Sequence, residues 1–296
     1  MEFNQIFCIL KRSEQEYYHS TQQRSNRFSK LSPIKQQKIN VSHENQVKFV
    51  ADLKKLTQEL GLKVNYIAAT DMDRVSPGKN DLIISCGGDG TFLSCAQHYQ
   101  NTFILGMNSD FSHTVGVGSA GALTSTNWTN LRQNLQSLLE KNYFIDQWSR
   151  LQVKINGELI PRLAVNDIYF GQKIAYQTCN FHITQSGVQE DFECSGVLCC
   201  TGMGSHAWYY NAGGSPFSNE IDAFGFKVLF PNLKRNLQFT SGIVSNRNEL
   251  IIFSEGDDYI LSFDSREDVL TMELGDEVRI FLAPDKDVRV VSFYPA

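Results

Sequence analysis

A short glycine-rich turn around one carboxylate has the clearest chemical potential in the chain. It follows the apolar run 82–84, precedes a helix-like stretch, and consists of Gly87, Gly88, Asp89, Gly90 and Thr91. Glycine has no Cβ atom, so the turn can adopt positive φ angles and present main-chain N–H groups to an oxygen-rich ligand. We interpret it as a phosphate-binding loop, although a glycine cluster by itself more often only joins a strand to a helix.

Two later stretches could complete a nucleotide site. Asn166 and Asp167 lie side by side in the otherwise apolar segment AVNDIYFG, where a buried amide or carboxylate needs a polar partner such as a sugar hydroxyl pair. The segment 201–211, TGMGSHAWYYN, places small residues before Trp208, so a flat ring such as adenine could approach the backbone and stack. The simpler alternatives are a strand ending in an Asn-Asp turn and an aromatic core cluster, with His206 as a surface or capping residue.

Length and composition predict two domains of ordinary size. The chain has 296 residues, of which 42% are hydrophobic. Its 27 Lys and Arg against 32 Asp and Glu give a net charge of -5, which argues against a nucleic-acid partner but leaves a nucleotide-sized ligand open. The apolar runs are far shorter than the roughly 20 residues that cross a bilayer, so we expect no membrane segment.

The N-terminus and the cysteines favour a reducing compartment. The first residues run into a strand-like stretch without a secretory or Arg-rich leader, so we expect a cytoplasmic protein, or a mitochondrial one if a leader has been removed. The seven cysteines form no Cys-x-x-Cys pair, and a bridge between the adjacent Cys199 and Cys200 would be strained, which predicts reduced thiols. The six histidines share no ligand-like spacing, and we predict no metal site built from side chains.

The first half alternates strands with helices, which predicts a largely parallel sheet. Asn108, Ser109 and Asp110 follow the fourth strand and should lie near Asp89 at the same sheet edge, unless they form only an Asx turn. Strands are expected at 5–10, 63–68, 81–85 and 102–107, and short helices at 91–99 and 131–142. A longer helix is expected to begin near Ser42 and to end just before Gly61, with Val47, Val50, Leu53, Leu56 and Leu60 on its apolar face.

The segment 11–40 is longer than an ordinary connection and carries seven basic and two acidic side chains. We expect a solvated, partly mobile loop. The alternative is that Lys11 and Arg12, at the carboxyl end of the first strand, help to neutralise phosphates.

From Leu151 onward the chain consists of short β-rich runs separated by Gly, Asn, Asp and Ser. We therefore expect an α/β domain over 1–146 and an all-β domain over 147–296, of which the last 15 or so residues could return to the first domain.

Taken in order, these motifs resemble those of the NAD kinase family across most of the chain. Gly87 to Thr91 matches the family's GGDGT, and residues 166–167 align with its Asn-Glu pair. Residues 201–211 resemble its Thr-Gly-rich segment, in the sequence pattern of the mitochondrial-type subgroup. Residues 106–110 resemble that subgroup's Gly-x-Asn-Thr-Asp, and 264–265, Asp-Ser, stand where the family often has Asp-Gly.

The resemblance implies a Rossmann-like α/β domain followed by a β-sandwich-like domain, and transfer of the terminal phosphate of ATP to the 2′-hydroxyl of the adenosine ribose of NAD. It also implies Mg²⁺ or another divalent cation with ATP, and a homodimer or higher homo-oligomer. The implied base is Asp89. The implied phosphate-binding residues are Gly87, Gly88, Gly90 and Thr91, and the implied NAD-binding residues are Asp89, Gly90, Asn108, Asn166, Asp167, Thr201, Ser205, His206, Ala207, Trp208 and Asn211.

Four departures from the family pattern bear on specificity. Asp167 is one methylene shorter than the usual Glu, His206 replaces the subgroup's Lys, Phe111 replaces a Pro, and Ser195 replaces an acid of the common bacterial enzymes.

Two alternative functions remain open. A lipid kinase of the diacylglycerol or sphingosine type shares the GGDGT loop, and a dinucleotide sensor could keep the pocket without catalysis. The sequence leaves open the donor, ATP or polyphosphate, the preference between NAD and NADH, and the source of positive charge at the phosphates, because no lysine follows the loop as in a P-loop.

Overall fold

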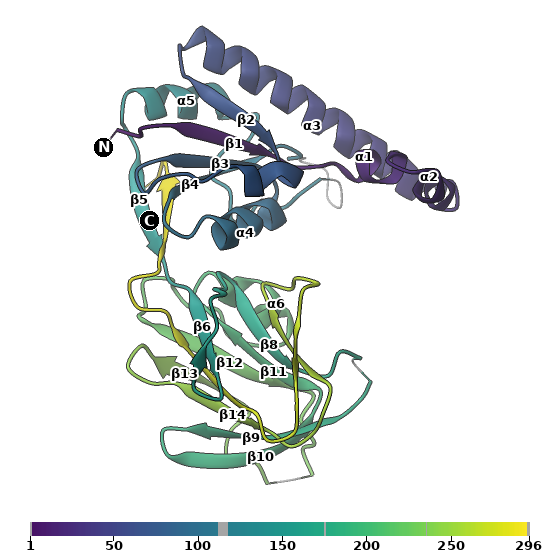
Figure 1. Ribbon diagram of the computed structural model, residues 1–296, viewed down its shortest axis with the longest axis vertical. Coiled ribbons are helices and arrows are strands. Elements are labelled where there is room, and N and C mark those ends of the chain that lie inside the picture. Colours follow the sequence, from purple (N-terminus) through teal and green to yellow (C-terminus); the bar gives the residue numbers. More distant parts are fainter. Residues whose placement is uncertain (1, 112–117, 175, 235, 295–296) are drawn as a thin grey trace. The chain divides into compact units, whose positions relative to one another are not determined.

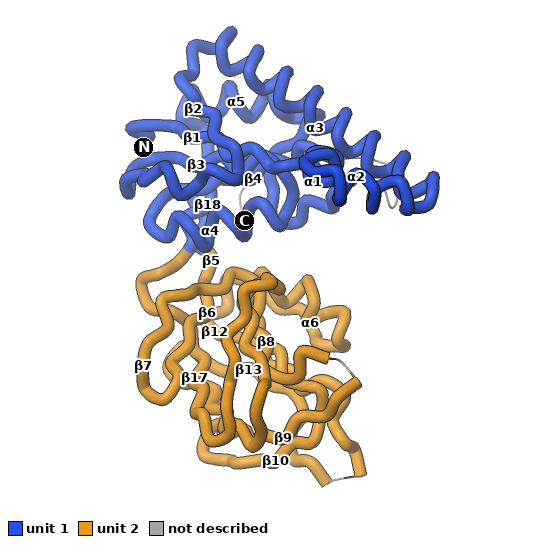
Figure 2. Tube along the Cα trace, turned by 45° about the vertical axis from the view of Figure 1, so that its right-hand side comes forward, with its two compact units in different colours: residues 1–147, 288–296 blue, residues 148–287 orange. Residues whose placement is uncertain are grey.

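The computed structural model describes residues 2–111, 118–174, 176–234 and 236–294, and divides the chain into two compact units (Figure 2). Unit 1 comprises residues 1–147 and 288–296, and unit 2 comprises residues 148–287. Among the described residues, no helix is both long and apolar enough to cross a membrane.

Unit 1 is built on a six-stranded sheet in the order β2-β1-β3-β4-β18-β5 (Figure 1). The pairs β1–β2, β1–β3, β3–β4 and β4–β18 are parallel, which confirms the expected sheet type. β3 and β4 are buried along their whole length, as strands covered on both faces must be. The strands are β1 (Ile6–Leu10), β2 (Val64–Ala68), β3 (Leu82–Gly87), β4 (Phe103–Asn108), β5 (Phe144–Trp148) and β18 (Val288–Ser292).

Helices cover this sheet. α3 (Pro33–Glu59) and α5 (Leu131–Leu139) contribute Phe49, Leu53 and Leu135 to the main core of the unit, while α4 (Asp89–His98) packs on β3 and β4 through Phe92. A short 3-10 helix, η1 (Ala69–Arg74), follows β2.

The expected loop over residues 11–40 is wrong, because this segment is helical. α1 (Glu14–His19) begins at a capping box in which Ser13 and Glu16 bond to each other's main chain, and α2 (Gln22–Phe28) follows it. α3 begins at Pro33, capped by Ser32, nine residues before the expected start near Ser42. Serine at the N-cap with proline in the first turn is a strong start signal, but the first turns of α3 are polar and have no apolar stripe.

Unit 2 consists of two antiparallel sheets with their main hydrophobic core formed by side chains such as Phe170, Phe181 and Phe224. One sheet has the order β10-β9-β14-β17-β6-β7 and the other β13-β12-β11-β8-β15-β16. The first comprises β6 (Leu151–Ile155), β7 (Glu158–Leu159), β9 (Cys179–Gln185), β10 (Val188–Cys194), β14 (Leu250–Ser254) and β17 (Glu277–Leu282). The second comprises β8 (Asp167–Gly171), β11 (Gly196–Cys200), β12 (Ala223–Leu229), β13 (Ser241–Ser245), β15 (Tyr259–Phe263) and β16 (Leu270–Met272).

All seven cysteines are free and buried. Burial raises the pKa of the Cys95 thiol to about 12 and that of Cys199 well above its usual value, so these thiols stay protonated at neutral pH.

Candidate active site

The glycine turn joins β3 to α4, so its residues form the N-terminus of a helix. Gly87 ends β3, Gly88 is the N-cap, and Asp89 opens the first turn. The expected positive φ angles are wrong, because Gly87, Gly88 and Gly90 all lie outside that region. Two of the glycines instead allow close approach: a Cβ atom on Gly87 would lie 2.1 Å from Thr91 Oγ1, and one on Gly88 would lie 2.3 Å from the Oγ of Ser119.

Main-chain N–H groups from a distant loop fix the Asp89 carboxylate. Its Oδ2 accepts a hydrogen bond from the N–H of Ala122 at 3.1 Å, and its Oδ1 accepts one from Leu123 at 2.8 Å. The side chain is therefore held in one orientation beside the turn. Gly121, with φ of 69°, lets the loop bend there, and a Cβ atom on it would lie 2.4 Å from Asn108 Nδ2.

The residues after β4 lie beside the glycine turn, as expected. The N–H of Ser109 donates to the carbonyl of Gly87 at 2.9 Å. Asn108 is buried, its Oδ1 accepts from the N–H of Asp110 at 3.1 Å, and its Nδ2 donates to the carbonyl of Ser119 at 3.0 Å. The Asx turn is thus present, and Asn108 uses both polar atoms to hold the surrounding loops.

Helix α3 braces two strand ends at this edge of the sheet. Ser42 Oγ and Asn45 Nδ2 both donate to the carboxylate of Asp110, after β4, and the Asn45 bond is 3.3 Å long. Gln46 Nε2 donates to the carbonyl of Lys11, after β1. The helix that replaces the expected loop therefore supports residues next to the turn.

A pocket of about 470 Å³ opens beside the turn in unit 1. Gly88, Asp89, Gly90 and Thr91 line one part of it, together with the hydroxyls of Ser94 and Ser119. Lys11 and Arg12 line another part, and in the part of the chain that the structure describes neither cation is in an ion pair. The pocket thus combines helix N-terminal amides with two cations, a combination suited to phosphate oxygens.

In unit 2, Asp167 is the first residue of β8 and Asn166 directly precedes it, so the alternative of a strand ending in a turn at this pair is wrong. The Asp264 carboxylate accepts hydrogen bonds from the N–H groups of Val165, Asn166 and Asp167, at 3.1, 2.7 and 3.3 Å. Among the described residues, the buried Asp167 Oδ1 and Asn166 Oδ1 have no hydrogen-bond partner. Burial, and secondarily the charge of Asp264, raises the pKa of Asp167 to about 7.

The segment 201–211 folds onto this pair as a tight turn. Thr201 accepts from the N–H of Gly204, while Ser205 donates to the carbonyls of Gly202 and Phe217. The main-chain N–H of Thr201 donates to the carbonyl of Asn166 at 3.0 Å. The hydroxyls of Thr201 and Ser205 are thus buried supports of the turn.

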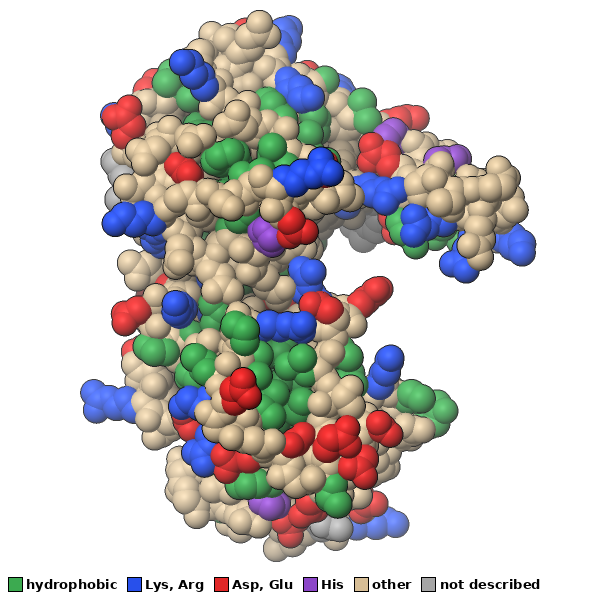
Figure 3. Space-filling model, viewed as in Figure 1, with side chains coloured by type: hydrophobic (Ala, Val, Ile, Leu, Met, Phe, Trp, Pro, Cys, Tyr) green, Lys and Arg blue, Asp and Glu red, His purple; other side chains and the backbone are tan. Residues whose placement is uncertain are grey.

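The remaining residues of this segment reach the surface. His206 is exposed, Ala207 is half-buried, and Trp208 and Asn211, on the short helix α6 (Trp208–Asn211), line a pocket of about 1150 Å³. The indole of Trp208 lies 5.3 Å from the ring of Tyr169, centroid to centroid. Figure 3 shows hydrophobic side chains exposed on the drawn face of unit 2 and acidic ones gathered in its lower part.

Sequence reasoning missed several supports of the site. No signal links the N–H groups of Ala122 and Leu123 to Asp89, because any residue supplies a main-chain N–H. Asp264 was identified only as a family position, and its acceptor role requires the tertiary fold. For Lys11 and Arg12, their charge and their place after a strand suggest a phosphate role only as the alternative to a solvated loop.

Comparisons with known proteins bear on both units. No family model matches the chain. It is 27% identical over 214 residues to an NAD kinase of Picrophilus torridus, covering 72% of this chain and 67% of that protein. The fold is similar to a solved NAD kinase from Archaeoglobus fulgidus in complex with ATP, with a TM-score of 0.66, 18% identity and coverage of 98% and 93%. It is also similar to yeast NADH kinase complexed with NADH, with a TM-score of 0.69, 20% identity and coverage of 99% and 84%.

Proposed function

We propose that this chain, which is similar to NAD kinases in sequence and in fold, transfers the terminal phosphate of ATP to the 2′-hydroxyl of the adenosine ribose of NAD, giving NADP. The observation that carries this proposal is the arrangement around Asp89. Its carboxylate is fixed by two main-chain N–H groups and lines a pocket that also contains Lys11 and Arg12.

Asp89 is assigned the role of general base. Phosphoryl transfer to an alcohol requires removal of the hydroxyl proton and alignment of acceptor with donor. A carboxylate held by N–H groups on both oxygens keeps lone pairs free for a substrate hydroxyl and does not have to be ordered during the reaction. General-base help of this kind contributes on the order of 100-fold to 10,000-fold in rate.

The triphosphate is assigned to the pocket of unit 1. The N–H groups at the start of α4 and its helix dipole favour anionic oxygens, and Lys11 with Arg12 supplies the positive charge that a P-loop lysine would supply. Mg²⁺, which would accompany ATP and neutralise phosphate charge, fits the oxygen donors that line this pocket, namely the hydroxyls of Thr91, Ser94 and Ser119.

We assign NAD-binding roles to residues within each unit. The orphaned oxygens of Asn166 and Asp167 suit the hydroxyls or carboxamide of the nicotinamide riboside, and Trp208 with Asn211, His206 and Ala207 suits the adenine side. Thr201, Ser205 and Asn108 act through the loops they hold. Asp89 and Gly90 are placed at the acceptor ribose.

We also propose a homodimer in a reducing compartment such as the cytoplasm. Phe230 and Leu233 line the large pocket of unit 2 and are 83% and 77% exposed, which leaves apolar surface that a second copy would cover. The seven free thiols support the compartment. Light scattering coupled to size-exclusion chromatography tests the subunit number.

The decisive test is formation of NADP or NADPH by the purified chain. NAD and NADH are each offered with ATP and with polyphosphate, with Mg²⁺ present, and product is measured with an NADP-specific dehydrogenase. We expect phosphorylated dinucleotide with at least one donor and its loss in Asp89→Asn. Phosphate appearing on an extracted lipid in place of the dinucleotide, or tight NAD binding without ADP release, would contradict the proposal.

A further inference from the structure

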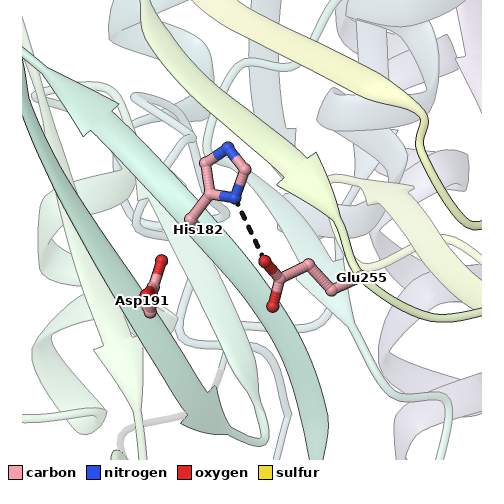
Figure 4. Close-up of side chains that lie close together, drawn as sticks. All are labelled: His182, Asp191 and Glu255. Atoms are coloured by element: carbon pink, nitrogen blue, oxygen red, sulfur yellow. Dashed lines mark hydrogen bonds and ion pairs between the residues drawn. The ribbon is translucent and has the colours of Figure 1, made fainter.

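Three metal-type ligands converge on the sheet of unit 2 that carries none of the residues assigned above. His182 lies on β9, Asp191 on β10, and Glu255 directly after β14. Ligand atoms of the three all lie within 4.8 Å of one another, and His182 Nδ1 lies 3.3 Å from Glu255 Oε1 (Figure 4). We propose that these side chains bind a divalent transition-metal ion, with Zn²⁺ preferred.

Strand pairing places the ligands on one face. His182 is directly opposite Asp191 in the β9–β10 pair, and opposite Phe253 in the β9–β14 pair. Side chains directly opposite each other in antiparallel strands point to the same face, with Cβ atoms about 5 Å apart. The neighbours of His182 along β9, Phe181 and Ile183, point into the core, so His182 points outward.

Two contacts restrain the ligands before any ion binds. The imidazole of His182 stacks on the ring of Phe253, with centroids 4.7 Å apart and planes 28° apart. The main-chain N–H of Glu255 donates to the carbonyl of Asn180 at 3.1 Å, which fixes where its side chain starts. Ligands that are already ordered lose less conformational entropy on binding.

The donor set suits zinc better than magnesium. Zn–N distances of 2.0–2.1 Å and Zn–O distances of 2.0–2.2 Å place tetrahedral ligands about 3.4 Å apart, close to the observed separation of His182 and Glu255. The more distant carboxylate oxygens would move inward by about 1 Å, which their exposure permits. Imidazole favours Zn²⁺ and its neighbours, whereas Mg²⁺ prefers an all-oxygen octahedron, so the cation that accompanies ATP should compete poorly.

The alternative is an ordinary surface ion pair between His182 and Glu255. The chain offers a matched pair for comparison, His98 with Asp73, whose Nδ1 and Oδ1 lie 3.6 Å apart. In the described part of the chain no third ligand completes that pair into a metal-binding group. Substitutions at Asp73 therefore report on a histidine–carboxylate contact alone.

The test is a calorimetric titration of Zn²⁺ into the chelator-treated full chain, with millimolar Mg²⁺ and a non-thiol reductant present. We expect one Zn²⁺ per chain, with affinity at least tenfold weaker in Asp191→Asn and in Glu255→Gln and lost in His182→Ala. Asp73→Asn should bind as the wild type does. The rise in melting temperature that Zn²⁺ gives the wild type should be smaller in Asp191→Asn and Glu255→Gln and absent in His182→Ala.

An NMR experiment distinguishes Zn²⁺ binding at this cluster from Zn²⁺ binding to the cysteine thiols. Imidazole NMR signals should show Zn²⁺ shifting His182 and leaving His98 unchanged. Equal Zn²⁺ affinity in the wild type, Asp191→Asn and Glu255→Gln, or no Zn²⁺ binding by the wild type, would overturn the proposal.

The metal site and the proposed function can be tested separately. Asp191→Asn should also form NADP at the wild-type rate. If the wild type binds Zn²⁺ at this cluster but forms no NADP, the proposed function fails and the metal site stands.

Discussion

The Asp89 carboxylate accepts a hydrogen bond from the main-chain N–H of Leu123, 34 residues further along the chain. A second bond, from Ala122, fixes the other oxygen. The turn that carries the proposed base and the loop that orients it therefore act together. Disturbing either should reduce turnover.

Replacing Asp89 with Asn should leave binding of NAD and ATP nearly unchanged and lower kcat by on the order of 100-fold to 10,000-fold, because the amide cannot take the hydroxyl proton. The amide nitrogen also faces an N–H donor, so a modest fall in melting temperature is expected. Steady-state kinetics with calorimetric binding separates the two effects. Wild-type turnover in this variant would refute the assignment.

The loop is tested at Gly121. In Gly121→Ala the new Cβ atom would combine a strained φ with a clash against Asn108, and kcat should fall at least tenfold as Asp89 loses its orientation. Gly61→Ala is the control, since its φ of 70° matches that of Gly121, 69°, and no atom of the described residues lies within 4 Å of its Cβ position. If both variants lose stability and activity equally, the loop has no special role.

The cations of the unit 1 pocket should act on the phosphate donor. Lys11→Ala and Arg12→Ala should each raise the KM for ATP several-fold, with a smaller effect on the KM for NAD, because each loses a charge-assisted contact. Arg27→Ala, an exposed cation on α2 outside the pocket, should behave as the wild type. Initial rates over a grid of both substrates give the two constants, and equal effects on both KM values would count against the placement.

The indole of Trp208 should contribute to dinucleotide binding. Trp208→Ala removes a partly exposed ring at the large pocket and should raise the KM for NAD by roughly 10-fold, consistent with about 1–1.5 kcal/mol for an aromatic contact. Trp128→Ala, which removes an exposed indole in unit 1, should leave that KM unchanged. An unchanged KM in Trp208→Ala would mean that the ring only packs against Tyr169.

The raised pKa of Asp167 predicts a pH effect on stability. The native state holds this proton up to a pKa of about 7, while the unfolded state releases it near the ordinary 3.8, so the native state binds more protons between these values. Stability from this group therefore falls as pH rises through that window, by about 2 kcal/mol between pH 5.5 and 8. Urea unfolding gives the free energy of unfolding of the wild type and of Asp167→Asn, and the difference between the two should change by that amount from pH 5.5 to pH 8. A difference that does not depend on pH would contradict the raised pKa.

Sequence patterns predicted most strands of unit 1 because apolar runs bounded by polar residues define buried strands directly. The expected strand 102–107 is β4, Phe103–Asn108, and the expected helix 91–99 is α4. The long helix was assigned the wrong start and partly the wrong face, since Val47 is 53% exposed while Phe49 is buried. Its polar first turns are stabilised by caps and by contacts with residues distant in sequence.

For the site, sequence identified side chains but not the main-chain partners. Asp89, Asn166 and Asp167 stand out because a carboxylate among glycines and a polar pair in an apolar strand are unusual. No local sequence pattern predicts the hydrogen bond from the Leu123 N–H or the contact between His182 and Glu255, which are 73 residues apart. Such contacts depend on strand order and register, which are set by the whole fold.

The bracing of two strand ends by α3 constrains where the length of this chain can vary. Ser42, Asn45 and Gln46 contact residues after β4 and β1, while Phe49 and Leu53 pack in the core, so one residue inserted between the two sets would rotate one relative to the other by about 100° and shift it by about 1.5 Å. An insertion between α1 and α2 would leave that register unchanged. Among relatives that share these contacts, insertions and deletions should therefore concentrate before Ser32.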